Sequence, residues 1–258
     1  MSSGVKGKNI YLKSAGELAI MRRAGHLLHQ VLHEVSEAVD EGVPTIELDK
    51  IAHSRIKEAR AIPAFLGQYG FPATLCISIN EAVVHGIPGK RKLEKGDIVS
   101  IDCGIVIDGF YADSAFTAPV GEISEEAQRL LATTKRALYR GIESAVYNHR
   151  VSEISRAVQD TVEGEGFSIV EDYTGHGVGR QLHEEPQVYN KYMGRGPRIG
   201  NGLTIAIEPM VNAGSTGQTK QLPDNWTVIS ADRSLSAHFE HTVAITRDGV
   251  EVLTRDPE

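Results

Sequence analysis

Four acidic residues lie in or directly after runs of β-branched and apolar residues, where a charged side chain is unusual. They are Asp102 in VSIDCGIV, Asp113 in FYADSAF, Glu208 in IAIEPMV and Glu240 in AHFEHTV. A carboxylate buried in such a strand is costly unless it is paired, hydrogen-bonded or bound to a metal ion. Any one of them is explained by a half-exposed strand or a buried ion pair, but four together favour a shared metal site.

A predicted hairpin brings two of these acids together. Asp108-Gly109, between two apolar runs, is a strong signal for a two-residue turn. Such a turn places Asp113 opposite Gly104, and Gly104 shares a face with Asp102 because side chains alternate along a strand. The two carboxylates are then diagonal neighbours with Cβ atoms roughly 7 Å apart, which suits a pair of cations about 3.5–4 Å apart. A bulge in the hairpin would change this register.

Three histidines are further candidates: His85 in AVVHGIPG, His176 in TGHGVGRQ and His183 in LHEEP. The glycines around His176 let the backbone approach a bound group closely. A lone histidine such as His85 is as often a packed or surface residue. One imidazole with four carboxylates is a hard, oxygen-rich donor set, which favours Mn(II), Fe(II) or Co(II) over a closed thiolate zinc site.

Other chemistries have little support. The chain has no P-loop, no G-x-S-x-G elbow, no H-E-x-x-H motif and no paired C-x-x-C. Its two cysteines, Cys76 and Cys103, lie in strand-like apolar runs, where inert packing is the simpler interpretation.

The elements that must position these residues follow from the periodicity of apolar side chains. Ser14 and Glu17 have capping-box spacing at the start of the first helix. Helices are predicted over about 15–39, 45–60, 125–147 and 151–163, and strands over 76–79, 97–107, 110–120, 166–170, 203–211 and 239–246. Both halves of the chain, about 14–120 and 121–250, thus have two helices followed by strands, which indicates an internal pseudo-twofold repeat.

Length and composition set the remaining limits. The 258 residues are 41% hydrophobic, and we expect one catalytic domain over 1–258 with an N-terminal arm at 1–13. The net charge of −7 argues against DNA as a partner. No apolar run reaches the roughly 18 residues of a membrane span. The opening MSSGVKGKNI lacks the apolar core of a signal peptide, so a reducing cytoplasm is the expected compartment.

Five segments together resemble the type I methionine aminopeptidases of the bacterial kind, over nearly the whole chain. They are CISINEAVVHGIPG, GDIVSIDCGIVIDGFYADSAFT, GHGVGRQLHEEPQV, GLTIAIEPM and SAHFEHTVAIT. The resemblance implies an α+β pita-bread fold, in which an antiparallel-rich sheet with pseudo-twofold symmetry encloses a dinuclear metal site. The first helix begins within about 15 residues, which leaves no place for an N-terminal zinc-finger extension.

The resemblance also implies a role for each candidate residue. Two divalent ions, Fe(II), Mn(II) or Co(II) with Zn(II) as a further option, would be held by Asp102, Asp113, His176, Glu208 and Glu240. A hydroxide bridging the metals would attack the first peptide bond, and Glu208 would carry the proton to the departing amine. His85 and His183 would contact the substrate, with His183 stabilising the oxyanion.

The implied methionine pocket matches the family less closely. Phe71, Cys76 and Trp226 stand at positions of family pocket residues, whereas Phe65, Gln68 and Leu182 replace the Cys, Tyr and Phe of many relatives. Methionine is still expected as the substrate, followed by a small second residue, because a flexible thioether fits an apolar slot.

Two other functions remain open from the residues. The first alternative is a catalytically silent binding protein of the same fold, and the second is an aminopeptidase for another N-terminal residue.

The natural substrates would be nascent polypeptides, which implies weak ribosome association. The stretch 212–234 carries only Lys220 and Arg233 against two aspartates, so the basic run at 90–95 is the expected contact with ribosomal RNA.

Overall fold

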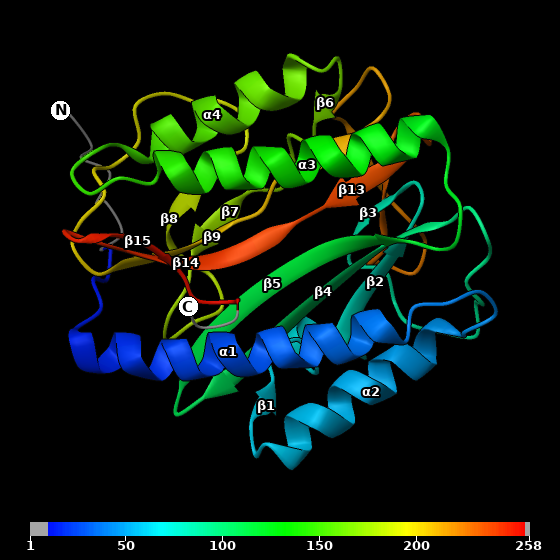
Figure 1. Ribbon diagram of the computed structural model, residues 1–258, viewed down its shortest axis with the longest axis horizontal. Coiled ribbons are helices and arrows are strands. Elements are labelled where there is room, and N and C mark those ends of the chain that lie inside the picture. The colour runs from blue at the N-terminus through cyan, green and yellow to red at the C-terminus, as the bar shows by residue number, and fades with distance from the viewer. Residues whose placement is uncertain (1–9, 256–258) are drawn as a thin grey trace, which may run out of the picture.

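The computed structural model describes residues 10–255 (Figure 1). Its helices are α1 (Ala15–Glu37), α2 (Thr45–Glu58), α3 (Glu125–Ser144) and α4 (Val151–Glu163), with a short 3₁₀ turn η1 (Gln68–Gly70). The four long helices agree with those expected from the apolar periodicity. The first three end two or three residues earlier than expected.

One large antiparallel sheet forms the centre of the molecule. Its strands are β1 (Ile62–Pro63), β2 (Leu75–Ile79), β4 (Ile98–Ile107), β5 (Phe110–Pro119), β7 (Gly175–Gly177), β8 (Glu184–Val188), β9 (Leu203–Ile207), β14 (Glu240–Thr246) and β15 (Gly249–Val252). They are ordered β1-β4-β5-β14-β9-β7-β8, with β2 also paired to β4 and β15 to β14.

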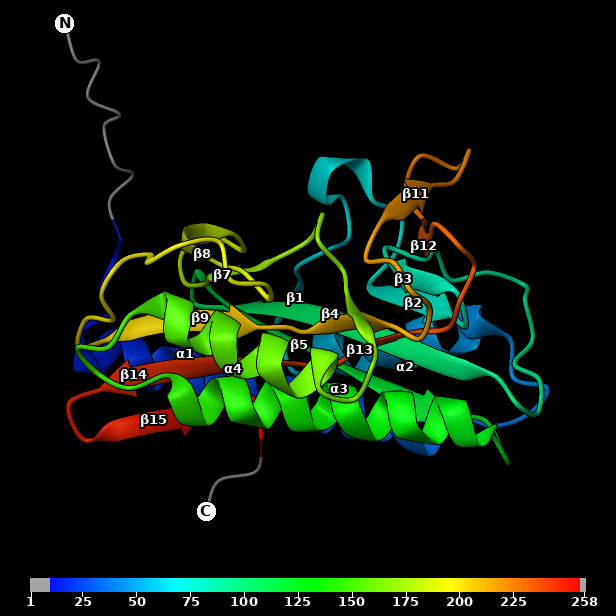
Figure 2. The ribbon, with the colours of Figure 1, turned by 90° about the horizontal axis from the view of Figure 1, so that it is seen from above.

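The two halves of the chain meet in the middle of this sheet. Strands β5 and β14 pair over only two positions, Glu240 with Ala115 and His241 with Ser114. All four long helices cover one face of the sheet, α1 and α2 over the first half and α3 and α4 over the second (Figures 1 and 2). The opposite face carries the loops and two small sheets. This is the predicted α+β pita-bread architecture with its repeated order of two helices and then strands.

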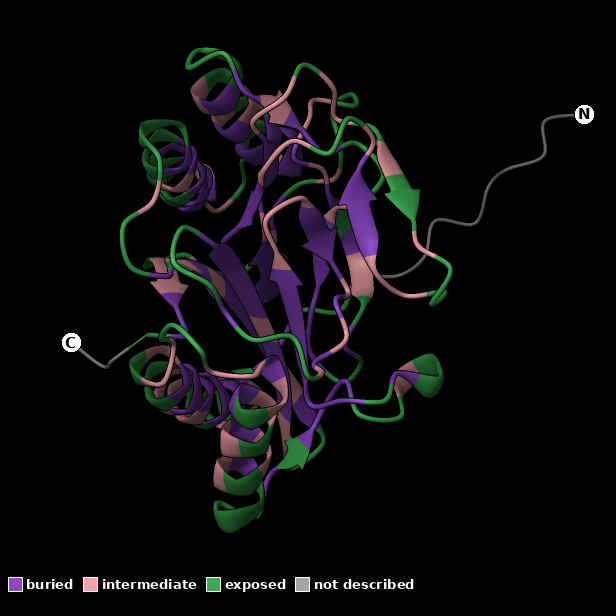
Figure 3. Ribbon diagram, turned by 90° about the vertical axis from the view of Figure 1, so that its right-hand side faces the viewer, coloured by how far each residue is buried: buried purple, intermediate pink, exposed green. Residues whose placement is uncertain are grey.

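The helices are held by their apolar faces. The capping box at the start of α1 is present, since the Ser14 hydroxyl accepts the Glu17 N–H and the Glu17 carboxylate accepts the Ser14 N–H. Leu28 and Val31 of α1 are fully buried against the strands of the first half. The interior strands are correspondingly buried on both faces (Figure 3). Burial of this kind contributes about 25 cal/mol per Å² of apolar surface, which anchors the strands that bear the acids.

The hairpin register predicted for β4 and β5 is confirmed. Asp108 and Gly109 have φ of 49° and 77°, the left-handed values that a tight two-residue turn requires. Gly104 pairs with Asp113, and the register runs from Ile107 and Phe110 to the far ends of both strands without a bulge. Asp102 and Asp113 therefore lie on one face of the sheet.

The predicted strand 203–211 is wrong as a single element. It divides at Glu208-Pro209, because proline has no N–H to continue the ladder. Beyond the break, β10 (Met210–Asn212) joins a small sheet with β6 (Ser168–Ile169) and β13 (Ser236–His238).

The stretch 212–234 also has regular structure of its own. It contains β11 (Thr219–Gln221) and β12 (Val228–Ser230), which form the second small sheet with β3 (Ala82–Val84). No helix within residues 10–255 is long and apolar enough to cross a membrane.

Candidate metal centre and substrate pocket

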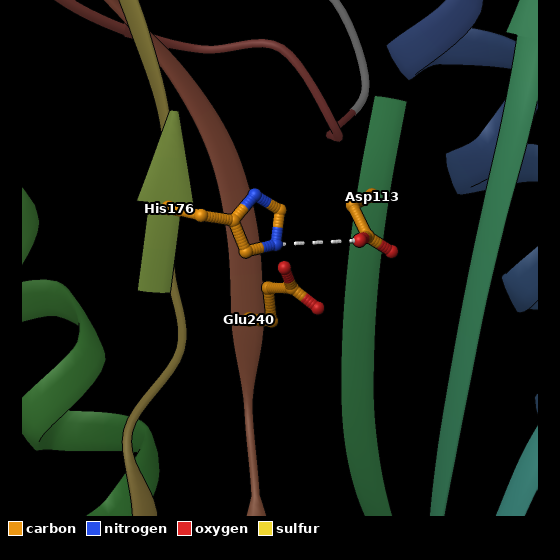
Figure 4. A group of neighbouring side chains, drawn as sticks. All are labelled: Asp113, His176 and Glu240. Carbon is orange, nitrogen blue, oxygen red and sulfur yellow. Dashed lines mark ion pairs between the residues drawn. The ribbon is translucent and has the colours of Figure 1, made fainter. Parts of the chain in front are cut away.

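Three buried side chains from both halves of the chain converge at the centre of the sheet. Asp113 lies on β5, His176 on β7 and Glu240 on β14, and each offers a ligand atom within 4.8 Å of the others. Figure 4 shows both carboxylates directed toward the imidazole, and His176 Nε2 lies 3.8 Å from Asp113 Oδ2. The set combines one nitrogen and two carboxylates, a donor set suited to a divalent metal ion.

Asp102 and Glu208 complete the acidic cluster. Asp102 on β4 contacts Asp113, as the confirmed hairpin register requires. Glu208 lies directly after the end of β9 and before Pro209, and its Oε1 is 3.3 Å from His176 Nε2. The five residues that sequence reasoning selected are therefore brought together at one place.

Burial and mutual repulsion govern the protonation of this cluster. Burial raises the pKa of Asp102, Glu208 and Glu240 well above their ordinary values, and the neighbouring carboxylates raise each of them further. Burial likewise raises the pKa of Asp113 to about 7. Without a cation the four acids would share protons, because that many negative charges cannot be held together away from water.

The unsatisfied atoms of the cluster fit a bound metal. Asp102 Oδ1, Asp113 Oδ1 and Glu240 Oε1 are buried and have no hydrogen-bond partner. Buried polar atoms without partners are rare, and here three of them are carboxylate oxygens of one cluster. Divalent cations would satisfy these oxygens and neutralise the charge, so the residues present fit divalent metal ions.

The orientation of His176 suits a ligand. Its Nδ1 lies 2.9 Å from the carbonyl oxygen of Gly177, so the ring donates there and leaves Nε2 free toward the acids. Burial lowers its pKa to about 3, which keeps the ring neutral and able to bind a metal. The flanking glycines make this strand possible, since a Cβ on Gly177 would lie 2.3 Å from the carbonyl oxygen of Glu185.

His85 and His183 line the same cavity, which has a volume of about 300 Å³, and both are more exposed than His176. The His183 ring lies 4.5 Å from that of His176, and the His85 ring lies 5.5 Å from that of Tyr173. Burial lowers the pKa of both histidines, and the charge of His183 lowers that of His85 further. Neutral imidazoles in this cavity can donate or accept a hydrogen bond to a bound peptide.

An apolar wall lines part of this cavity. It consists of Phe65, Phe71, Cys76, Leu182 and Trp226, and Gln68 lines the cavity beside it; these are the pocket residues named from the sequence. Phe71 and Trp226 meet edge to face at 5.1 Å between ring centroids. The Phe65 ring packs directly against Gly104. A Cβ at residue 104 would lie 2.8 Å from the ring, so a larger residue there would displace it.

Cys76 contributes to this wall as a neutral thiol. Burial raises its pKa well above the ordinary value, and the charges of Asp102 and Asp113 raise it further. The expectation that Cys76 is not a nucleophile agrees with this environment.

Sequence reasoning missed several residues of the cavity: Tyr173, Met210 and His238 line it as well. His238 is buried, and its Nε2 lies 3.7 Å from Glu208 Oε2 without a hydrogen-bond partner. Its spacing of two from Glu240, which puts both residues on one face of an extended chain, was a usable signal. Tyr173 lies in a loop and had no such signal.

Comparisons with known proteins agree with this geometry. The model of metallopeptidase family M24 matches residues 19–247. The methionine aminopeptidase of Clostridium perfringens is 50% identical over 246 residues, which are 95% of this chain and 98% of that relative. The crystal structure of methionine aminopeptidase from Thermotoga maritima superposes with a TM-score of 0.94 at 40% identity, over 96% of this chain and all of that one.

A more distant neighbour shares the fold alone. The prolidase from Pyrococcus furiosus has a TM-score of 0.78 at 22% identity, and the match covers 96% of this chain but 66% of the prolidase. The residues that the M24 family model matches, 19–247, include both halves of the sheet and every acid and histidine of the cluster. By sequence, fold and the acidic centre, this chain belongs to metallopeptidase family M24.

Proposed function

We propose that this chain removes the N-terminal methionine from peptides and nascent proteins. One observation carries the proposal: a buried cluster of four carboxylates and an imidazole, with three unpartnered oxygens, forms the floor of a cavity whose other wall is apolar and aromatic. The relatives named methionine aminopeptidase, at up to 50% identity over nearly the whole chain, support the same activity.

The acidic cluster would hold two divalent ions. Asp113 and Glu240 would be ligands of both ions. Asp102 would complete the ligands of one ion, and His176 with Glu208 would complete those of the other. When bound, Fe(II), Mn(II), Co(II) or Zn(II) supplies Lewis acidity, and lowers the pKa of a water molecule toward neutrality.

The remaining steps belong to side chains of this chain. His183, neutral and lining the cavity, donates a hydrogen bond to the carbonyl oxygen of the first peptide bond as negative charge develops on it. His85 holds the nitrogen of that bond. Glu208, whose carboxylate lies among the acids that line the cavity, would carry a proton to the departing amine.

The apolar wall would select the methionine side chain. Phe71 and Trp226 form an aromatic corner, while Cys76 and Phe65 supply polarisable and bulky surface. A thioether fits such a slot well because it is flexible and polarisable. Leu182 and Gln68 shape the remainder of the pocket.

The test compares peptides with the metal-loaded enzyme. Met-Ala-Ser should be cleaved with a much larger kcat/KM than Leu-Ala-Ser, and Xaa-Pro peptides should not be cleaved. Equal use of Leu-Ala-Ser would point to an aminopeptidase of different specificity. No turnover of any peptide by protein with verified metal content would favour a silent binding protein of the same fold.

The second residue of the substrate should be small. His85 and His183 both line the cavity that holds the acids, so a bulky second side chain would meet an imidazole. Met-Leu-Ser and Met-Lys-Ser should therefore have much lower kcat/KM than Met-Ala-Ser, and equal values across the three would refute this proposal.

Nascent chains in the cytoplasm would be the natural substrates, which implies a transient encounter with the ribosome. The basic run at 90–95 is the proposed contact, and the net charge of −7 accounts for its weakness.

A further inference from the structure

A lysine of the N-terminal arm is buried beside the turn that carries His183. The Lys13 side chain is 1% exposed, and its Nζ lies 2.5 Å from Glu184 Oε2 and 3.2 Å from the carbonyl oxygen of Tyr11. The Lys13 backbone N–H donates to the carbonyl oxygen of Gly202 at 2.7 Å, which anchors the arm to the start of β9. A lysine this buried is rare unless it is paired.

The partner of Lys13 organises the turn from inside. Glu184 uses its second oxygen, Oε1, to accept the backbone N–H of Arg180 at 2.6 Å and that of Gln181 at 3.2 Å. A Cβ on Gly179 would lie 2.3 Å from Lys13 Cε, so the turn closes directly around the lysine. We call residues 179–184 the histidine turn, because it presents Leu182 and His183 to the cavity.

The outer side of the histidine turn is held less firmly. The Arg180 side chain is 58% exposed, and its guanidinium lies 3.1 Å from Glu17 and over the ring of the buried Phe110. Exposed ion pairs of this kind contribute little.

On the backbone side, the Tyr111 N–H donates to the carbonyl oxygen of Gly179 at 2.7 Å. Among the side-chain contacts of the turn, the Lys13–Glu184 pair is the buried one, and it is the contact that holds the Arg180 and Gln181 N–H groups in place.

We propose that Lys13 is a positioning residue for His183, acting through Glu184 and the backbone of the histidine turn. The inference rests on the proposed function, because His183 is assigned there to the carbonyl oxygen of the substrate. Without the ammonium group, the Glu184 carboxylate would be buried and unpaired, a state of high free energy. Glu184 also borders a cavity of about 570 Å³. It would turn toward water there and release the N–H groups of Arg180 and Gln181.

The effect should appear in kcat rather than in KM. His183 contributes mainly when charge develops on the oxygen, so a displaced imidazole slows turnover more than it weakens substrate binding. Lys13→Met removes the charge and keeps the length of the side chain. We expect it to lower kcat on Met-Ala-Ser by roughly 10- to 100-fold, the usual cost of losing a group that orients a functional residue, with KM changed by less than about threefold.

A double-mutant cycle separates positioning from a general structural role. If Lys13 acts through His183, Lys13→Met should cause almost no further loss of kcat in a His183→Ala background. The control is Arg22→Met, which removes an exposed ion pair between residues far apart in the chain, Arg22 and Glu251 at 2.7 Å. It should leave kcat unchanged. Equal fold losses from Lys13→Met in both backgrounds would overturn the inference.

A neutral pair provides the rescue. In Lys13→Met/Glu184→Gln no charge is left buried, and the amide oxygen at 184 can still accept the two N–H groups, so kcat should recover to within a few fold of the unmodified chain. Failure to recover in a protein with an unchanged thermal midpoint would overturn the inference.

If Lys13→Met does not fold, Glu184→Gln takes its place in the cycle with the same expected non-additivity. Lack of activity in the unmodified, metal-loaded chain would instead refute the proposed function, so the two failures are distinguishable.

Discussion

At the scale of single residues, the site separates groups that could bind metal from groups that could touch only substrate. Among the groups that could bind metal, His176 directs Nε2 at Asp113 and Glu208, and the buried acids have carboxylate oxygens without hydrogen-bond partners. His183 meets the His176 ring edge to face, but it is exposed where His176 is buried. Two histidines with rings 4.5 Å apart should therefore respond differently to mutation.

This difference gives a direct prediction. His176→Ala should lower both metal content and turnover, because it removes a ligand. His183→Ala should keep its metal and slow turnover by roughly 10² to 10³, the scale of one lost oxyanion donor. Metal analysis by mass spectrometry, together with kcat on Met-Ala-Ser, distinguishes the two. Loss of metal from His183→Ala would show that the roles are assigned wrongly.

At the scale of elements, hydrogen bonds at helix ends and turns hold the parts that bear the site. The start of α1 is the clearest case. The Tyr11 hydroxyl donates to Glu17 at 2.6 Å, and the Ser14 N–H donates to it at 2.9 Å. These bonds, that from Tyr11 above all, lower the pKa of Glu17 from 4.5 to about 2. The arm that carries Lys13 thus enters α1 through a network that needs an ionised Glu17.

Glu17→Gln tests this network through its pH dependence. Because the folded-state pKa lies below the unfolded one, the contribution of Glu17 to stability is present above pH 4.5 and is lost as the pH falls toward 2. At pH 7 the variant should lose about 1 kcal/mol of unfolding free energy, as for other lost caps. The difference between the two proteins should shrink below pH 4.5, as measured by urea unfolding. A difference independent of pH would contradict the role of the ionised carboxylate.

At the scale of the whole molecule, the long helices cover one face of the large sheet (Figure 2). Cys103 and Ala112 pack in the core beneath α1 and α2, so their neighbours Asp102 and Asp113 face the other way. The helices of each half bury one face, and the acids occupy the seam between the halves on the other. The pairing of β5 with β14 covers only two positions there, beside Asp113 and Glu240. Four buried carboxylates at such a seam cannot all be ionised without a counter-charge, so cations would also contribute to joining the halves.

Metal removal should therefore affect both activity and stability. A strong chelator should abolish cleavage of Met-Ala-Ser, and Mn(II), Fe(II) or Co(II) should restore it. The same ions should raise the thermal unfolding midpoint of the metal-free protein, since a ligand that binds only the folded state stabilises it. Undiminished cleavage after verified removal of all metal would contradict the prediction. Activity and calorimetry on the same samples provide the measurement.

The surface charge determines what is expected of ribosome binding. Lys220 Nζ donates to the carbonyl oxygen of Ala231, and Lys95 pairs with Glu122. We expect weak, salt-sensitive co-sedimentation with ribosomes that Lys220→Ala barely changes, whereas neutralising the basic residues at 90–95 reduces it, because phosphate contacts scale with local positive charge. Loss of binding on Lys220→Ala alone would overturn this expectation.

The sequence by itself determined the local structure and much of the chemistry. The starts of the four long helices follow from capping residues and apolar periodicity, whereas three of them end two or three residues earlier than the pattern predicts. The Asp108-Gly109 turn sets the hairpin register, because a two-residue turn leaves one pairing. That register alone placed Asp102 beside Asp113. The motifs around His85, His176, His183, Glu208 and Glu240 indicated the family, as the M24 match confirms.

Only the tertiary structure decided which distant segments meet. The contact of His176 with Asp113 joins residues from different halves, and no periodicity encodes a pairing of strands so far apart in the chain. The break at Pro209, the cavity positions of Tyr173 and His238, and the burial of Lys13 against Glu184 likewise depend on packing between elements. Local patterns reflect steric and hydrogen-bonding preferences of neighbouring residues, whereas these contacts exist only because the two halves close on each other and exclude water.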